Sequence, residues 1–291
     1  MPFLSLEFDL GGTDPDAADN ACFAAGALSV TLHDARDDAV LEPAPGEVRL
    51  WPATRVAALF PAEASSAEVL IDLAARLGID AGRIEARFVA DRVWEREWLR
   101  DFHAMRFGRR LWICPHHERV DAAEAVVVRL DPGLAFGTGT HPSTALCLEW
   151  LDGAALAGRS LIDYGCGSGV LAIAAARLGA APVHAFDIDP QALVATRDNA
   201  AANDVAAVVQ TCASVEELPA SADVLVANIL AGTLCELAAA LAARVRPGGW
   251  IVLAGILEAQ ADTVTSAYAP WFDIGIYGRR DGWVALAGKR R

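Results

Sequence analysis

The chain has 291 residues, 54% of them hydrophobic, which is enough apolar material for one large or two ordinary domains with buried cores. Its formal net charge of −14 argues against direct nucleic-acid binding, because phosphate contacts require a basic face. No apolar segment approaches the roughly 20 residues of a membrane-spanning helix and no export signal is recognisable, so we expect a cytoplasmic protein that binds no membrane.

Hydrophobic alternation and helix-start signals predict six elements in the N-terminal part. They are a strand at 3–10, a helix from Asp14-Pro15 to about Gly26, strands at 28–33 and 47–51, a helix at 65–77 and a strand at 84–89. The order β-α-β-β-α-β is that of a ferredoxin-like sandwich. We therefore expect an α+β domain over residues 1–90.

This N-terminal part is strongly acidic. Residues 1–80 contain 4 Arg and no Lys against 14 Asp plus Glu, a net charge of −10. The acidity serves either solubility or the docking of a basic partner, and the sequence leaves both readings open.

Residues 91–120 are predicted to form a linker with a helix and a strand. Trp94, Trp98, Leu99 and Phe102 recur at helical spacing and favour a packing face between lobes. The segment 114–117 offers one Cys and two His, but no second cluster lies at the spacing of a zinc finger, so no metal site is expected. The six cysteines are scattered, which fits a reducing compartment.

From residue 121 to 291 the pattern changes to short apolar runs followed by turns and Ala/Leu-rich helices, which is typical of a parallel sheet with crossover helices. The predicted strands are 160–163, 183–187, 207–213, 224–228 and 250–255; the predicted helices are 170–178, 190–203 and 233–245. Residues 271–277 and 283–287 are predicted to form a closing hairpin. The fold class is α/β with a Rossmann-like sheet.

Three glycines spaced two apart, Gly165, Gly167 and Gly169, lie between an apolar strand and the helix that begins near Val170. Glycine leaves room for a ligand to approach the backbone, and free N–H groups at the helix start favour a carboxylate or phosphate. Gly165 and Gly167 are therefore candidate cofactor contacts. A dinucleotide fingerprint has its third glycine at another spacing, and a tight turn without a ligand is the alternative.

The next two strands end in polar side chains. Asp187 follows Gly165 by 22 positions, where a βαβ unit delivers a carboxylate to a ribose diol. Asp189 precedes Pro190 and is better explained as a helix N-cap. Asn228 ends a further strand at the end of the sheet where open α/β folds bind ligands; it is either a contact to cofactor or substrate, or a turn-forming residue.

These features, together with Asp131–Thr144, closely resemble the PrmA family, the ribosomal protein L-eleven methyltransferases, over nearly the whole chain. The most specific parts are the Phe136–Thr144 loop and Asn228–Ala231. The resemblance implies a ferredoxin-like lobe that recognises the ribosomal protein and a class I methyltransferase domain that trimethylates its amino groups. It further implies that Thr144, Gly165, Asp187 and Asn228 contact S-adenosylmethionine.

Methyl transfer to an amine requires alignment of a neutral nitrogen and exclusion of water, so we predict positioning by Asn228 and the Phe136–Thr144 loop and identify no catalytic residue. His141 is either a proton acceptor or a helix-entry residue. Ile229-Leu230 stand where enzymes that methylate nucleobases or glutamine have two prolines, which argues against a clamp for such planar amines and leaves lysine or α-amino acceptors open. A small-molecule methyltransferase and a nucleotide-binding Rossmann module remain as alternatives.

Overall fold

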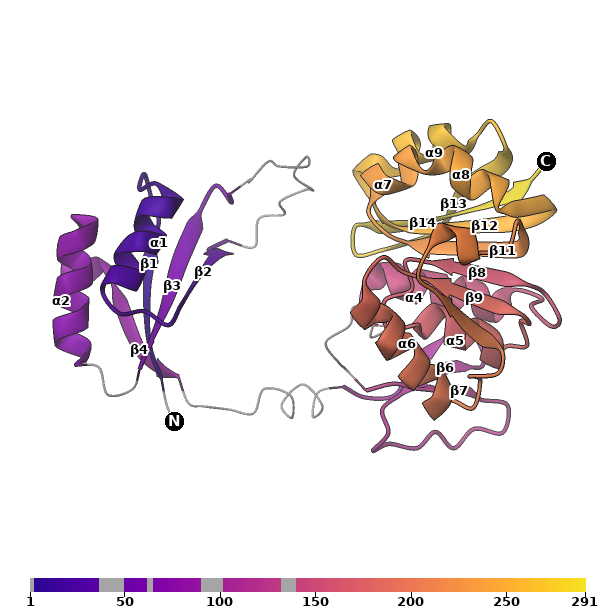
Figure 1. Ribbon diagram of the computed structural model, residues 1–291, viewed down its shortest axis with the longest axis horizontal. Helices are drawn as coiled ribbons and strands as arrows, with labels where there is room; N and C mark the ends of the chain where they lie inside the picture. Colours follow the sequence, from indigo (N-terminus) through magenta and orange to yellow (C-terminus); the bar gives the residue numbers. More distant parts are fainter. Residues whose placement is uncertain (1–2, 37–49, 62–64, 90–101, 132–139) are drawn as a thin grey trace. The chain divides into compact units, whose positions relative to one another are not determined.

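The structure is a computed structural model that describes residues 3–36, 50–61, 65–89, 102–131 and 140–291. The chain divides into two compact units, Met1–Val93 and Trp94–Arg291 (Figure 1). Each unit buries its own hydrophobic residues. No helix in the described ranges is both long and apolar enough to cross a membrane.

The first unit is a four-stranded antiparallel sheet in the order β2-β3-β1-β4, with two helices. Its elements are β1 (Phe3–Asp9), α1 (Pro15–Ala24), β2 (Ser29–Asp34), β3 (Thr54–Pro61), α2 (Ser66–Leu77) and β4 (Glu85–Val89). Asp14 caps α1 by accepting a hydrogen bond from the Ala17 N–H at 3.1 Å, and Gly78 ends α2 at a φ of 66°. The predicted ferredoxin-like order is confirmed.

The third strand lies elsewhere than predicted. We expected it at 47–51, but residues 50 and 51 are not in a strand and β3 spans Thr54–Pro61; residues 47–49 lie outside the described ranges. Alternate residues Val56, Ala58 and Phe60 are buried along β3. Its two alanines have low strand propensity, so pairing with β1 on one side and β2 on the other decided the position of this strand.

The second unit is built on a seven-stranded sheet in the order β10-β9-β8-β11-β12-β14-β13. The strands are β8 (Leu161–Tyr164), β9 (Val183–Phe186), β10 (Val209–Cys212), β11 (Ala222–Asn228), β12 (Val245–Leu257), β13 (Phe272–Arg280) and β14 (Trp283–Arg290). The first five pair in parallel, and β14 runs antiparallel between β12 and β13. The Rossmann-like sheet and its closing hairpin are confirmed.

Helices cover both faces of this sheet (Figure 1). One face carries α4 (Pro142–Gly153), α5 (Val170–Arg177) and α6 (Pro190–Ala202), and the other carries α7 (Ala231–Glu236), α8 (Ala238–Ala243) and α9 (Ala261–Tyr268). The helix predicted at 233–245 is thus two short helices that meet at Leu237. Strands buried on both faces account for the continuous apolar runs in the sequence.

A small third sheet, in the order β5-β6-β7, precedes α4. Its strands are β5 (Met105–Phe107), β6 (Leu111–Cys114) and β7 (Val126–Arg129). Phe102, Phe107 and Ile113, which lie in the predicted linker, are buried in the same core as α4 and α5. Residues 102–114 therefore belong structurally to the second unit. Of the residues whose spacing predicts a linker helix, Trp94, Trp98 and Leu99 lie outside the described ranges.

Candidate functional site

A site-like feature of the second unit lies at the carboxyl ends of its parallel strands. Chain order reverses between β8 and β11, which leaves a crevice where open α/β folds bind ligands. A cavity of about 1020 Å³ opens at this end, and we call it the main cavity. Its walls come from the loop after β8, the end of β9, part of α6, the segment after β11, and Leu130-Asp131.

The loop after β8 has the backbone conformation that its glycines predict. Gly165, Gly167 and Gly169 have φ values of 82°, 54° and 79°, which L side chains rarely adopt. A Cβ at position 165 would lie 2.4 Å from Ile229 Cγ2. Gly165 and Gly167 line the main cavity, with the start of α5 directly after the loop. The loop thus presents backbone to a ligand at a helix N-terminus, where an anionic group is favoured.

Asp187 also lines the main cavity, directly after β9. One carboxylate oxygen accepts a hydrogen bond from the Gly167 N–H at 2.9 Å, and the other accepts from the Asp189 N–H at 3.0 Å. Each ionised oxygen can accept further hydrogen bonds, so the carboxylate can still receive a diol. Asp189 caps α6 through the Gln191 N–H at 2.9 Å, which confirms its predicted N-cap role.

Thr144 and Asn228 meet beside the main cavity. The Asn228 Nδ2 donates a hydrogen bond of 3.0 Å to the hydroxyl of Thr144, which is buried in the first turn of α4. Ile229, the residue after Asn228, lines the main cavity. Thr144 and Asn228 are not among the described residues that line it. The five predicted site residues thus form two adjacent groups, Gly165, Gly167 and Asp187 in the cavity, and Thr144 with Asn228 next to it.

His141 is the N-cap of α4. Its Nδ1 accepts from the Ser143 N–H at 3.3 Å, and its ring meets the Trp283 ring edge-on at a centroid distance of 4.6 Å. Partial burial lowers the pKa of His141 below its ordinary value. The geometry favours the helix-entry reading of this residue. Residues 136–139 of the Phe136–Thr144 loop lie outside the described ranges.

Apolar side chains complete the walls of the main cavity. Ile188, directly after Asp187, is 87% exposed, and Leu230, two residues after Asn228, is 58% exposed. Large apolar side chains that are exposed in a cavity wall indicate a binding surface, because a planar apolar group can pack against them. We did not predict Ile188; its signal in the sequence is an isoleucine placed between two acids.

A second residue that the sequence analysis missed is Asp163, in β8 two positions before Gly165. It is fully buried and accepts a hydrogen bond from the Ala172 N–H, in the first turn of α5, at 3.0 Å. Its other oxygen has no hydrogen-bond partner among the described residues. Burial, opposed by that hydrogen bond and reinforced by the charge of Asp187, raises the pKa of Asp163 to about 7.

The raised pKa makes stability depend on pH. In the unfolded chain an Asp has a pKa near 4, so folding favours the protonated form of Asp163. The protonated side chain stabilises the fold at acid pH, and this stabilisation is lost as the pH rises through about 7. Relative to Asp163→Asn, which stays neutral, the wild type should lose on the order of 3 kcal/mol of unfolding free energy between about pH 5 and pH 8. Urea unfolding at both pH values measures this difference.

The matched control is Asp273→Asn, on an exposed position of β13. Its unfolding free energy relative to the wild type should stay constant over the same pH range. A constant difference for Asp163→Asn as well would contradict the pH dependence assigned to the buried acid.

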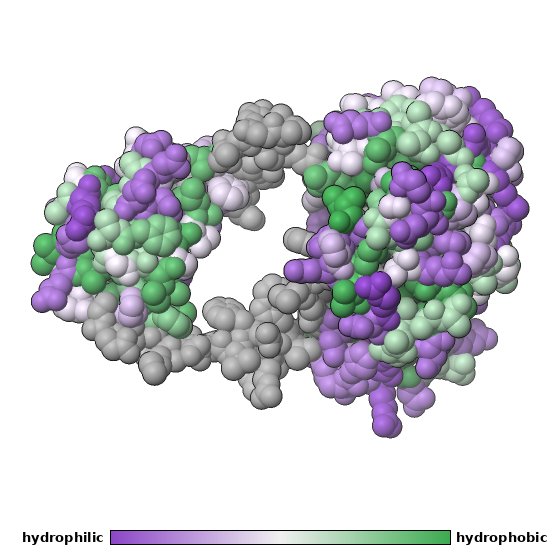
Figure 2. Space-filling view, in the orientation of Figure 1, coloured by the Kyte–Doolittle hydropathy of each residue, from purple (hydrophilic) through white to green (hydrophobic). Residues whose placement is uncertain are grey.

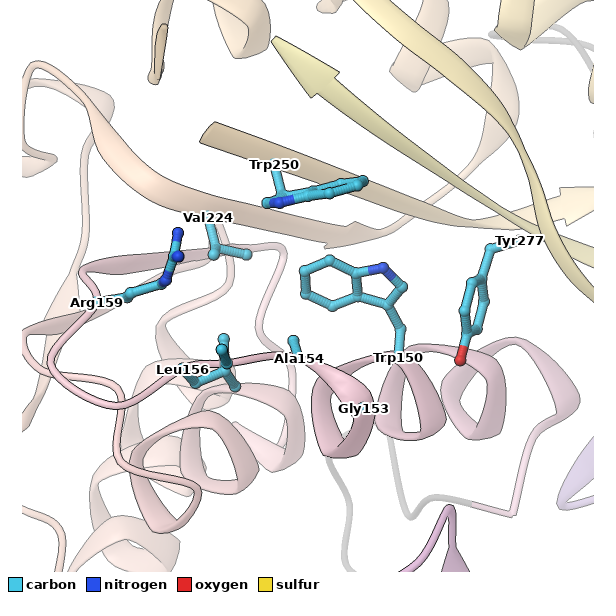
Figure 3. A pocket seen from close by; sticks show the side chains of 9 residues that line it. Trp150, Gly153, Ala154, Leu156, Arg159, Val224, Trp250 and Tyr277 are labelled. Carbon is cyan, nitrogen blue, oxygen red and sulfur yellow. The ribbon is translucent and has the colours of Figure 1, made fainter. Parts of the chain in front are cut away.

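A smaller pocket of about 330 Å³ lies at the opposite end of the sheet, near the beginnings of β8 and β11. Figure 3 shows the rings of Trp150, Trp250 and Tyr277 around it, with the Arg159 side chain at another side. The centroids of the two Trp rings are 6.0 Å apart. None of the predicted site residues lines this pocket, so we do not assign the predicted chemistry to it.

The segment 114–117 contributes to packing and hydrogen bonding. The Arg129 guanidinium donates to Cys114 Sγ and to the Pro115 carbonyl oxygen, both at 3.0 Å, and His116 pairs with Asp131 at 3.1 Å. Burial raises the pKa of the Cys114 thiol. In the described ranges, no group of three or more His, Cys, Asp or Glu side chains is placed to hold a metal ion.

Comparison with known proteins extends over both units. Residues 2–291 match the family model described as Ribosomal protein L11 methyltransferase (PrmA). The ribosomal protein L11 methyltransferase of Methylococcus capsulatus is 53% identical over 283 residues, 96% of this chain and 97% of that protein. The one from Pseudomonas aeruginosa is 48% identical over 292 residues, 100% of this chain and 99% of that protein.

A solved structure is similar as well. The crystal structure of ribosomal protein L11 methylase from Lactobacillus delbrueckii subsp. bulgaricus has a TM-score of 0.60 at 33% identity. The match covers 65% of this chain and 100% of that chain.

Proposed function

The chain belongs to the ribosomal protein L11 methyltransferase (PrmA) family, and from this membership we propose that it transfers methyl groups from S-adenosylmethionine to amino groups of ribosomal protein L11. The acceptor groups are lysine side chains, the N-terminal amine, or both, and the reaction takes place in the cytoplasm. We call the loop after β8, Gly165–Gly169, the glycine loop. The observation that carries the proposal is that this loop and Asp187 line the same cavity, where the chain order reverses between β8 and β11.

The main cavity fits S-adenosylmethionine group by group. Backbone N–H groups at the start of α5 suit its carboxylate, and Asp187 suits its ribose diol. The exposed faces of Ile188 and Leu230 suit its adenine. When bound, this cofactor supplies an electrophilic methyl group on a sulfonium ion.

The protein's own residues then have to align the acceptor nitrogen and keep water away from it. Because Asn228 donates its Nδ2 hydrogen to Thr144, its Oδ1 is left to accept a hydrogen bond from the acceptor amine. Gly255 keeps the space near that oxygen open, since a Cβ there would lie 3.2 Å from Asn228 Oδ1. We assign Asn228 to orienting the amine and Thr144 to holding Asn228.

The first unit is proposed to receive the ribosomal protein. Residues 1–80 carry a net charge of −10, which attracts a basic protein over a distance set by ionic strength. Figure 2 shows hydrophobic residues among hydrophilic ones on the visible face of this unit, and Leu28, Ile71 and Phe88 are more than half exposed. Charge speeds the encounter, and apolar side chains contribute the burial that a stable contact requires.

Mass spectrometry of purified L11 after incubation with the enzyme and S-adenosylmethionine tests the function directly. We expect added methyl groups on lysine or α-amino nitrogens with the wild type. The matched controls are L11 whose amines have been acetylated and an equally basic non-ribosomal protein, neither of which should gain methyl groups. Cofactor binding without any methylation of L11 would refute the proposed acceptor, and methylation of both basic proteins would refute its specificity.

A further inference from the structure

Helix α6 carries polar side chains on a face that is turned into the protein. Thr196, Asn199 and Asn203 are spaced three and four residues apart, so they lie on one side of the helix and its C-cap. Thr196 is fully buried, Asn203 is 4% exposed and Asn199 is half-buried. Buried polar groups are tolerated when they are hydrogen-bonded, so their partners indicate what this face holds in place.

The first two residues of this face hold the glycine loop. The Thr196 hydroxyl donates to the Gly167 carbonyl at 3.1 Å, and the Asn199 Nδ2 donates to the Ser168 carbonyl at 2.9 Å. The contact is so close that a Cβ at Gly169 would lie 2.8 Å from the Thr196 side chain. One helix thus fixes two consecutive peptide groups of the loop that lines the main cavity.

Asn203 binds a different part of the chain, the edge of β7. Its Oδ1 accepts from the Arg129 N–H at 2.6 Å, and its Nδ2 donates at 2.8 Å both to the Arg129 carbonyl and to the Asn199 carbonyl. Among the described strands, β7 pairs only with β6, and the N–H of Leu130, next to Arg129, donates to the Cys114 carbonyl at 3.1 Å. The Asn203 amide therefore satisfies the peptide of Arg129 as a neighbouring strand would.

Two cavity walls are consequently attached to one face of α6. Leu130 and Asp131, directly after the residue that Asn203 holds, line the same cavity as Gly167 and Ser168. Asp131 is also fixed from its other side, because its Oδ1 accepts from the His116 N–H at 2.9 Å. We propose that Asn203 is a positioning residue that sets the Leu130–Asp131 wall relative to the glycine loop and thereby determines the affinity for the methyl donor. This inference rests on the proposed function of the cavity.

The test uses the full chain with S-adenosylhomocysteine as the probe. Asn203→Leu keeps the branched arrangement of side-chain heavy atoms and removes every side-chain hydrogen bond of this residue. We expect its dissociation constant for the probe, measured by calorimetry, to rise by about tenfold or more, with kcat at saturating cofactor changed by less than about threefold. Amide hydrogen exchange over residues 126–131 should accelerate in the same variant.

Ser160→Ala is the matched control. It also removes partly buried side-chain hydrogen bonds in the second unit, those between Ser160 and Asp223, but at the amino end of the sheet, away from the main cavity. We expect it to lower the melting temperature and to leave the dissociation constant of the probe unchanged. Should Asn203→Leu fail to fold, Asn203→Asp keeps the size, loses the amide donor and should shift the same measurements in the same direction.

The outcomes separate the inference from the function on which it rests. A wild type that binds no S-adenosylhomocysteine overturns the proposed function before any variant is compared. If the wild type binds but Asn203→Leu keeps full affinity, or if it loses no more affinity than Ser160→Ala at a similar melting temperature, the positioning role of Asn203 is refuted.

Discussion

Asp187→Ala is expected to weaken binding of S-adenosylmethionine by about 100-fold, which corresponds to roughly 3 kcal/mol of binding free energy. The carboxylate has two tasks, since it faces the cavity and also accepts hydrogen bonds from the N–H groups of Gly167 and Asp189. Its removal takes away the proposed ligand of the ribose diol and releases the glycine loop. Isothermal titration calorimetry with the wild type and the variant measures the loss.

A cofactor analogue separates these two tasks. In the wild type, 2′-deoxy S-adenosylhomocysteine should bind more weakly than S-adenosylhomocysteine, whereas Asp187→Ala should bind both equally. Asp189→Ala is the control, because this neighbouring acid is exposed and caps α6. If the variant still distinguishes the two ligands as the wild type does, Asp187 acts only by holding the loop and the diol assignment is wrong.

Asn228→Ala is expected to lower kcat for L11 methylation by about 100-fold, with the dissociation constant of S-adenosylmethionine changed only a few-fold. Asn228 lies beside the main cavity, and we assign it to orienting the acceptor amine. A misaligned nucleophile slows the chemical step but does not weaken binding of the methyl donor. Single-turnover kinetics with saturating cofactor measures the chemical step.

Variants of Thr144 provide the control for this prediction. Thr144→Val keeps the shape of the side chain but removes the hydroxyl that accepts from Asn228, so it should lower kcat by about tenfold. Thr144→Ser keeps a hydroxyl at this position and should retain the wild-type rate. An unchanged kcat together with a raised dissociation constant in Asn228→Ala would instead make Asn228 a cofactor ligand, as the family resemblance implies.

Prediction from the sequence succeeded where local chemistry determines structure. Glycines spaced two apart between an apolar strand and a helix take the positive φ values expected of them, and Asp189 before Pro190 caps a helix. It failed at β3, where alanine-rich residues 54–61 form the strand because two neighbouring strands pair with them. It also failed at the helix expected over 233–245, which is interrupted at Leu237.

The sequence by itself determined the two kinds of unit, the family resemblance, and the residue types that a cofactor loop and strand-end ligands require. Only the tertiary structure decided which of these residues meet. It placed Gly165, Gly167 and Asp187 in one cavity, paired Thr144 with Asn228 across 84 residues of chain, and attached β7 to α6 through Asn203. The physical reason is that helix caps and glycine turns depend on neighbouring residues, whereas hydrogen bonds between distant segments exist only after the sheet has brought those segments together.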